Sequence, residues 1–322
     1  MEQSHARWKS RSGFTERLRP VRWNGKHMKI LVFDIGGTFI KYGCCVNHKL
    51  TEIHEVPTEA EKGGPHILEK VISLISGQMD YDAIGISTAG QVNADEGSII
   101  YANSNIPAYT GTEIRKVLEK RFHVPVMAEN DVNAAAMGEA VYGAGREKKT
   151  FLCLTYGTGI GGAIVQDRMI YHGATFSAAE FGAIVTHAEE KIHGKDFFDG
   201  CYEKYASVTA LVQRAMKYEK ELTDGRKIFE KLDDPEVFRI VDEWIDEIMM
   251  GLGSLIHIFN PSCVILGGGI MTQPFITDQI RQRISRYVMP NFAHVEILPA
   301  MLGNSAGLLG INYLTCEYRY KG

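Results

Sequence analysis

The segment LVFDIGGTFIKYG, residues 31–43, constrains the fold of this chain more than any other. An apolar run ends at Asp34, Gly36, Gly37 and Thr38 follow, and a second apolar run begins, which predicts a hairpin with a nearly bare tip. At such a tip a phosphate group can approach backbone N–H groups, Thr38 can donate a hydroxyl hydrogen bond, and Lys41 supplies positive charge. Glycine pairs also occur in hairpins for steric reasons alone, so a purely structural turn stays open.

A second glycine loop lies in LTYGTGIGGAIV, residues 154–165. It contains Gly157, Thr158, Gly159, Gly161 and Gly162. It is not a Walker A loop, because no Lys-Ser/Thr pair follows, and it is not a dinucleotide fingerprint, because the residues after it resemble a strand. A third cluster that includes Gly268 and Gly269 ends the apolar run CVILGGG. Over three unrelated turns, we favour two hairpin loops and one strand end that face a common cleft and hold the phosphates and nucleoside of ATP.

The rest of the chain alternates predicted strands and helices. Strands are expected at residues 30–34, 42–46, 83–87, 124–129, 150–156, 161–166 and 263–266. Helices are expected at residues 65–75, 113–122, 132–142, 208–217, 235–259 and 307–315. The helix 235–259 is the clearest, because its apolar residues recur every three or four positions. The alternation predicts an α/β chain with two sheets.

Length and composition narrow the class of protein. A chain of 322 residues with 45% hydrophobic content can bury a full core, and its length favours two domains. The net charge of −4 argues against wholesale binding to nucleic acid or to an anionic membrane. The six cysteines do not form the pattern of a disulfide framework, which favours a reduced, cytoplasmic setting. The longest apolar span, residues 248–259, is too short to cross a bilayer.

Residues 1–27 differ from the rest of the chain. They carry seven Lys or Arg against two acidic residues and show no sustained apolar period. We interpret them as a disordered extension or an artificial addition rather than as a basic arm for nucleic acid.

The sequence VPVMAENDVNAAAMGEAVYG runs a strand into an alanine-rich helix and places Asn130 and Asp131 at the helix start. Asp131 could be an N-cap with no chemical role. Alternatively, it accepts a proton from a sugar hydroxyl as that oxygen attacks the γ-phosphate of ATP, and the positive helix N-terminus keeps its carboxylate ionised. The amide of Asn130 suits hydrogen bonds to neighbouring hydroxyls.

Taken together, DIGGT, ENDVNAAAMGE, GTGIGGAIV, AEFG and VILGGG, in this order and spacing, resemble the ROK family of bacterial sugar kinases and related repressors, within the actin-like ATPase superfamily. The resemblance covers about residues 28–315. It implies two ribonuclease-H-like lobes with mixed sheets around a central cleft, and often a homodimer. It also implies ATP with Mg²⁺ as the phosphate donor and a sugar as the acceptor, usually through the 6-hydroxyl of a hexose. The implied first lobe is residues 28–146 plus 304–318, the second is residues 147–303, and the final helix packs back on the first lobe.

By motif position, the resemblance also implies roles for single residues. Asp34, Gly36, Gly37, Thr38 and Lys41 form the first phosphate region, and the loop from Gly157 to Gly162 forms the second. Gly268 and Gly269 fall near the adenosine, and Asp131 takes the position of the catalytic base. Glu180 and Glu203 fall where the family binds sugar hydroxyls, as does Asn105 in SNIP. Without the resemblance, Glu180 could be a solvated charge, and Glu203 could simply complement a helix dipole.

One departure from the family pattern stands out. Many members bind a structural zinc through a histidine and three cysteines, and the equivalent positions here are Ala183, Gly194, Asp196 and Cys201. With one ligand of four, no structural zinc is expected. A replacement site from His187, His193 and Cys201 is disfavoured against surface histidines and a packed cysteine.

The missing histidine also affects the predicted sugar pocket, because the family uses it near the anomeric end of the sugar. The methyl group of Ala183 removes a hydrogen bond and opens volume there. We therefore expect the pocket to accept a C1 substituent, as in a β-glucoside, or a different hexose epimer; N-acetylmannosamine or glucose kinase activity stays open. The rival class is a sugar-responsive repressor, but residues 1–27 are too few for a helix-turn-helix domain.

Overall fold

The computed structural model describes residues 22–23, 26–78, 80–192, 194 and 196–320. The prediction for residues 1–27 therefore falls largely outside the described part of the chain. Within it, β1 (Arg22–Trp23) and β2 (Lys26–His27) pair as a short antiparallel ribbon.

The first large sheet contains five strands in the order β5-β4-β3-β6-β9. They are β3 (Lys29–Ile35), β4 (Phe39–Val46), β5 (Lys49–Pro57), β6 (Ala83–Thr88) and β9 (Val126–Asn130). The first three form an antiparallel meander, whereas β6 and β9 extend the sheet in parallel with β3. The small hairpin of β7 (Gln91–Asn93) and β8 (Ser98–Tyr101) follows β6.

The second large sheet repeats this arrangement in the order β12-β11-β10-β13-β14. Its strands are β10 (Phe151–Tyr156), β11 (Ile160–Gln166), β12 (Met169–Ile170), β13 (Cys263–Gly267) and β14 (Glu296–Pro299). Again three antiparallel strands come first, and two parallel strands extend the sheet. The predicted class, α/β with two mixed sheets, is confirmed.

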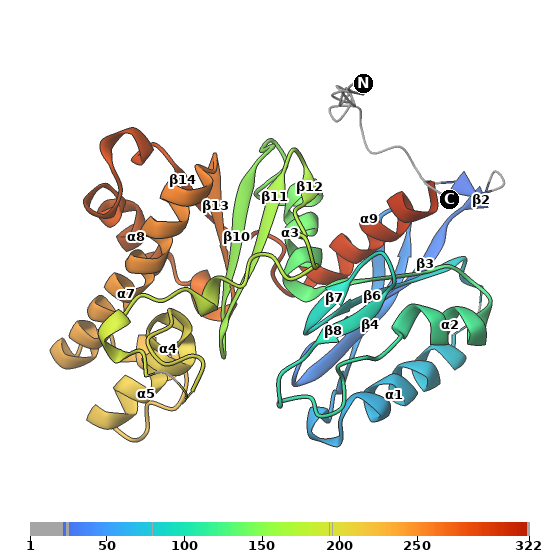
Figure 1. The fold of residues 1–322 in the computed structure, drawn as a ribbon, viewed down its shortest axis with the longest axis horizontal. Helices are drawn as coiled ribbons and strands as arrows, with labels where there is room; N and C mark the ends of the chain where they lie inside the picture. The colour runs from blue at the N-terminus through green and yellow to red at the C-terminus, as the bar shows by residue number, and fades with distance from the viewer. Residues whose placement is uncertain (1–21, 24–25, 79, 193, 195, 321–322) are drawn as a thin grey trace, which may run out of the picture.

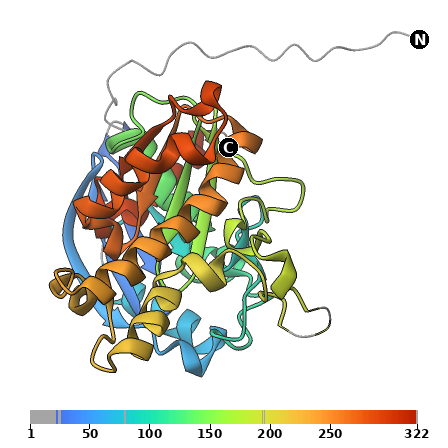
Figure 2. The ribbon, with the colours of Figure 1, turned by 90° about the vertical axis from the view of Figure 1, so that its left-hand side faces the viewer.

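Helices cover both faces of each sheet (Figure 1). They are α1 (Gly64–Ser76), α2 (Ile114–Phe122), α3 (Asp131–Tyr142), α4 (Glu203–Ala206), α5 (Val208–Tyr218), α6 (Gly225–Glu230), α7 (Pro235–Phe259), α8 (Pro274–Tyr287) and α9 (Ala306–Tyr320). We call the first sheet with α1 and α2 the first lobe, and the second sheet with α4 to α8 the second lobe. Helices α3 and α9 lie between the two sheets (Figure 1), and α7 and α8 run side by side over the outer face of the second sheet (Figure 2).

Strand alternation explains these layers. In β3, Leu31 and Phe33 belong to the core under α1 and α2, whereas Ile30 and Val32 belong to the core under α9. The second sheet divides in the same way between the core under α7 and the core under α3. The central strands β3, β6, β10 and β13 are buried on both faces, as sheets with helical layers on each side require.

Helices α3 and α9 approach each other closely because glycines face the crossing. A Cβ atom on Gly310 would lie 1.7 Å from the carbonyl oxygen of Ala134, and one on Gly138 would lie 2.3 Å from that of Ala306. Helix α9 also packs against the first sheet through Leu308 and Ile311. The C-terminal helix therefore returns to the first lobe, and neither glycine could carry a side chain at this crossing.

The elements that the sequence predictions missed include β5, β14 and α8. Strand β5 is an exposed edge strand with charged and polar side chains, so it lacks the apolar alternation of a half-buried strand. Strand β14 has four residues, and α8 is amphipathic but rich in Arg and Gln. In the described ranges, none of the helices combines the length and the apolar character that a membrane-spanning helix requires.

Candidate functional site

The first glycine loop joins β3 to β4, and its charged residues flank it as a cross-strand pair. Asp34 lies opposite Lys41 in the ladder, and the N–H of Gly36 donates to the carbonyl of Phe39 at 3.0 Å, which closes the turn. Ser87 Oγ on the neighbouring β6 donates to Asp34 Oδ1 at 2.6 Å. Burial raises the pKa of Asp34, against the lowering effects of the Ser87 hydrogen bond and of Lys41.

Lys41 also links this loop to the segment before α9. Its Nζ donates to Asn304 Oδ1 at 3.1 Å, and the first turn of α9 approaches Asp34 so closely that a Cβ on Gly307 would lie 3.0 Å from Oδ1. At Gly37, by contrast, a Cβ would meet nothing within 4 Å, so the tip of the loop faces open space.

Thr58, which the sequence predictions missed, fixes the first loop from the end of β5. Its hydroxyl donates to the carbonyl of Gly36 at 2.7 Å, and its N–H donates to the carbonyl of Thr38 at 2.8 Å. Thr58 is fully buried. Because β5 itself was not predicted, the sequence held no signal that this threonine meets the glycine loop.

Asn130, rather than Asp131, is the N-cap of α3. Its Oδ1 accepts from the N–H groups of Val132 and Asn133 at 2.9 and 3.0 Å. Its Nδ2 donates to the carbonyl of Gly90 and to Asp131 Oδ1, both at 2.9 Å. The capping interpretation of Asp131 is therefore wrong, because its neighbour performs that role.

Asp131 is half-buried in an acidic environment. Burial, and next the negative charge of Asp34, raise its pKa to about 7, although the Val132 N–H and Asn130 act in the opposite direction. Burial and the charge of Asp34 act against the expected effect of the helix N-terminus, which would favour an ionised Asp131. At neutral pH the side chain is close to the midpoint of its titration, where a proton acceptor works efficiently.

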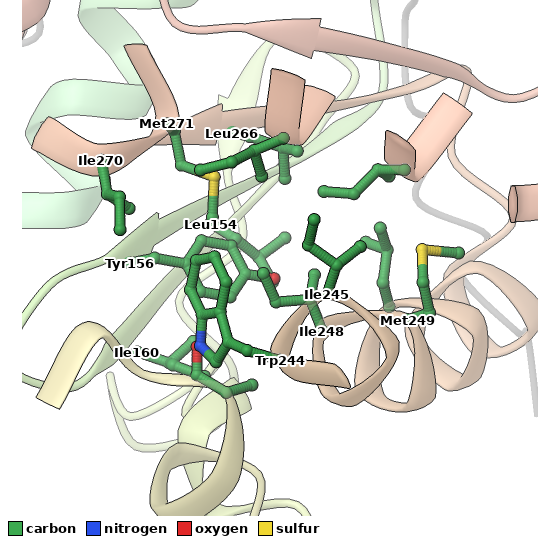
Figure 3. Close-up of a cluster of buried hydrophobic side chains, with 14 of the residues drawn as sticks. Leu154, Tyr156, Ile160, Trp244, Ile245, Ile248, Met249, Leu266, Ile270 and Met271 are labelled. Carbon is green, nitrogen blue, oxygen red and sulfur yellow. The ribbon is translucent and has the colours of Figure 1, made fainter. Parts of the chain in front are cut away.

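The second glycine loop joins β10 to β11 and is anchored by helices of its own lobe. The N–H of Val208 donates to the carbonyl of Gly157 at 3.0 Å, and Thr209 Oγ1 donates to the carbonyl of Thr158 at 2.8 Å. Beneath the loop, Tyr156 and Ile160 belong to the same buried cluster as Trp244 of α7 (Figure 3). The loop carries no charged residue, and its position depends on packing and on hydrogen bonds to its backbone carbonyls.

Glu203 lies against this loop. Its Oε2 accepts from the N–H of Ile160 at 2.8 Å, and a Cβ on Gly159 would lie 2.2 Å from the same oxygen. Burial raises the pKa of Glu203, and the charge of Glu180 adds to the increase. The two glutamates are thus close enough for the charge of Glu180 to act on Glu203.

Glu180 makes a contact across the two lobes. Gln91 Nε2, at the start of β7, donates to Glu180 Oε1 at 2.8 Å, and Ser177 Oγ donates to Gln91 Oε1, also at 2.8 Å. Glu180 is the residue before the short turn Phe181–Ala183, so Ala183 lies one turn away. Gln91 was not predicted, because an isolated glutamine after a strand carries no recognisable signal.

Gly268 and Gly269 follow β13 at the edge of a pocket of about 760 Å³. The pocket is lined by α6, by the start of α5 and by the turn Gly269–Thr272, and includes Val208, Arg226 and Gln273. Gly268 has φ +103°, and a Cβ there would lie 2.1 Å from the carbonyl oxygen of Tyr156. The pocket volume falls within the roughly 300–1,000 Å³ typical of small-molecule sites.

Asn105 lies in the segment between β8 and α2. It is exposed, and its N–H donates to Asn103 Oδ1 at 3.1 Å within its own turn. No group of three metal-ligating side chains is found among the described residues. His187 stacks on Tyr205, Cys201 lies near Lys191, and His193 is outside the described residues, so the expectation about zinc stays a prediction.

Comparisons with known proteins agree with this arrangement. The model of the ROK family matches residues 30–317. The chain belongs to the ROK family. A β-glucoside kinase from Listeria innocua is 32% identical, over 89% of this chain and 97% of the relative.

Two solved structures of the ROK type match nearly the whole chain. A Listeria monocytogenes protein with the provisional name N-acetylmannosamine kinase is 29% identical with a TM-score of 0.82, over 91% of this chain and 100% of that one. A Streptomyces griseus ROK glucokinase in complex with glucose and AMPPNP is 29% identical with a TM-score of 0.76, over 89% and 98% of the two chains. The fold is that of the actin-like ATPases, as the sequence motifs predicted.

Proposed function

We propose that this chain is an ATP-dependent sugar kinase that transfers the γ-phosphate of ATP to a hexose or β-glucoside, at the 6-hydroxyl of a glucose-type ring. The observation that carries the proposal is the position of Asp131, which lies at the start of α3, close enough to Asp34 for the two charges to interact. A proton acceptor with a pKa near neutrality thus adjoins a glycine loop suited to phosphate groups.

Asp131 accepts the proton of the attacking hydroxyl. Asn130 and the N–H of Val132 both donate to Oδ1, so they hold the carboxylate in one orientation and leave Oδ2 better placed for the substrate. In-line transfer needs little from the protein beyond such positioning and the stabilisation of charge.

The two glycine loops bind the phosphates. Gly37 and Gly157 face open space, where backbone N–H groups can meet phosphate oxygens, and Lys41 adds positive charge to the first loop. Thr38 supplies a hydroxyl donor at the same tip. The pocket beside Gly268 and Gly269 takes the nucleoside, and its location next to Val208 places it beside the anchor of the second loop.

The residues present also fit a magnesium ion. Asp34 offers carboxylate oxygens at the first loop, and burial has raised its pKa, so a nearby cation would stabilise its charged form. Mg²⁺ bound there with ATP would neutralise charge on the phosphates during transfer. Asp34 is the residue we propose to hold it.

Glu180 and Glu203 bind hydroxyls of the sugar, and Asn105 and Asn130 are proposed to join them, Asn130 by giving up one of the hydrogen bonds that its amide makes here. We expect the small side chain of Ala183, three residues after Glu180, to leave room for a C1 substituent, and the named relatives include both β-glucoside kinase and glucokinase. The alternative acceptor is N-acetylmannosamine, after which one of the similar structures is named. We further propose a cytoplasmic homodimer: the six cysteines are free thiols, and a dimer is typical of the family.

The test is product analysis with Mg-ATP and a panel of glucose, mannose, N-acetylmannosamine, N-acetylglucosamine, cellobiose and an aryl β-glucoside. We expect stoichiometric ADP and sugar phosphate with at least one acceptor, with the phosphate on the 6-oxygen by NMR. No sugar phosphate from any acceptor, with folded protein, would overturn the kinase proposal. If free hexoses react but neither cellobiose nor the aryl β-glucoside does, the proposal that Ala183 admits a C1 substituent would be overturned.

A further inference from the structure

Residues 171–180 of the second lobe, which we call the strap, lie against the first lobe. Phe176 packs against the core that contains Ile30 and Met127, and Ser177 donates to Gln91 of β7. Phe176 and Ala179 have φ of +59° and +68°, in the left-handed region that side chains other than glycine rarely occupy. Tertiary contacts therefore hold the strap in a conformation that its own sequence does not favour.

A further contact joins His172 of the strap to Glu129, the residue before Asn130. His172 Nε2 lies 2.7 Å from Glu129 Oε2, and the Glu129 side chain is only 1% exposed. The other oxygen of Glu129 accepts from the backbone N–H of Asn130 at 2.8 Å and from Asn133 Nδ2 at 3.1 Å. One buried carboxylate thus connects the strap to the turn that presents Asp131.

We propose that His172 is a positioning residue for phosphoryl transfer: through Glu129 it fixes the Asn130–Asp131 turn, so that Asp131 is correctly placed only while the strap lies on the first lobe. This proposal rests on the proposed kinase function. The strap ends at Glu180, so the same segment joins the acceptor-binding carboxylate to the residue that takes the acceptor's proton.

The burial of Glu129 explains why it depends on His172. Burying a carboxylate as completely as Glu129 is costly unless a cation or strong donors pair with it. His172 supplies the cation: burial disfavours its charged form, but the Glu129 contact and, more weakly, Asp95 outweigh that and raise its pKa. Without His172, Glu129 Oε2 would lose its partner on the strap, and the carboxylate would be less firmly held in the orientation that bonds to Asn130 and Asn133.

The experiment compares His172→Gln with His172→Arg and, as a control on the same strap, with Ser177→Ala. Steady-state kinetics are measured with the best acceptor, together with hydrogen exchange of the Val132 and Asn133 amides, which bond to Asn130. We expect His172→Gln to lower kcat at least tenfold with the KM for ATP within twofold, and to speed exchange of both amides. His172→Arg, which keeps the positive charge, should restore most of the wild-type kcat and most of the protection of the two amides. Ser177→Ala should leave the exchange of both amides unchanged.

A double-variant cycle keeps the test decisive if His172→Gln is poorly folded. In the Glu129→Gln background, where no buried charge remains to be neutralised, His172→Gln should have little further effect on kcat. Wild-type kcat and amide exchange in His172→Gln, or equal additional losses in both backgrounds, would overturn the proposal. If the wild type phosphorylates no sugar, the kinase function fails, and amide exchange alone still decides the role of His172.

Discussion

The two lobes share one strand order but differ in where they carry charge. Each contains a three-residue glycine loop between its first two antiparallel strands. The first loop is flanked by Asp34 and Lys41 and lies near Asp131, whereas the second is uncharged and fastened by Val208 and Thr209. We therefore propose that the same topology supplies chemistry in the first lobe and a binding surface in the second.

The contrast between the lobes predicts its largest effect, on kcat, for a substitution beside the charged first loop. Asp131→Asn should reduce kcat by about 10²–10⁴-fold, the usual contribution of a general base, with KM values little changed. Thr209→Val, which removes one anchor of the second loop, should cost only a few-fold. Initial rates of ADP release would show both, and equal losses for the two variants would remove the distinction between the lobes.

The glycines offer a second comparison. Gly162→Ala should destabilise the protein by about 1–3 kcal/mol, because its Cβ would lie 2.4 Å from the backbone oxygen of Ala179. Gly37→Ala should leave stability unchanged but raise the KM for ATP, because the open space at its tip is where we place phosphate. Thermal unfolding and ATP titration separate the two, and a large drop in Tm for Gly37→Ala would contradict this assignment.

A smaller effect concerns stability and pH. The folded protein holds the Asp131 proton up to a pKa of about 7, above the ordinary value of 3.8, so this group favours unfolding increasingly as pH rises between those values. Asp131→Asn should therefore be more stable than wild type at pH 8 and about equally stable at pH 4. Denaturant unfolding at the two pH values tests this, and a variant less stable than wild type at pH 8 would show that burial of Asp131 is not costly.

Much of the fold could be predicted because its signals are local. The apolar period from Phe238 to Phe259 indicated the extent of α7, and the run ending at Asp34 indicated the first hairpin. Strand β5 was missed because an exposed edge strand has no apolar pattern. The close crossing at Gly138 and Gly310 was missed because it depends on two helices about 170 residues apart.

The site was predictable to a similar extent. Motifs located the two loops and the Asn130–Asp131 turn, but not which of these two residues caps α3 or how Asp34 affects the pKa of Asp131. Contacts between the lobes, such as Gln91 with Glu180, have no sequence signature because each partner is ordinary in its own segment. The roles of Glu203 and Asn105 stay predictions.

The role of Asp131 as the proton acceptor is best tested by the pH dependence of kcat/KM, measured with both substrates below their KM. We expect kcat/KM to rise with pH to a plateau, with a midpoint near 7 set by Asp131 in the free enzyme, and the residual activity of Asp131→Asn to lack this rise. A flat profile between about pH 5.5 and 8, or the same rise in Asp131→Asn, would contradict this role.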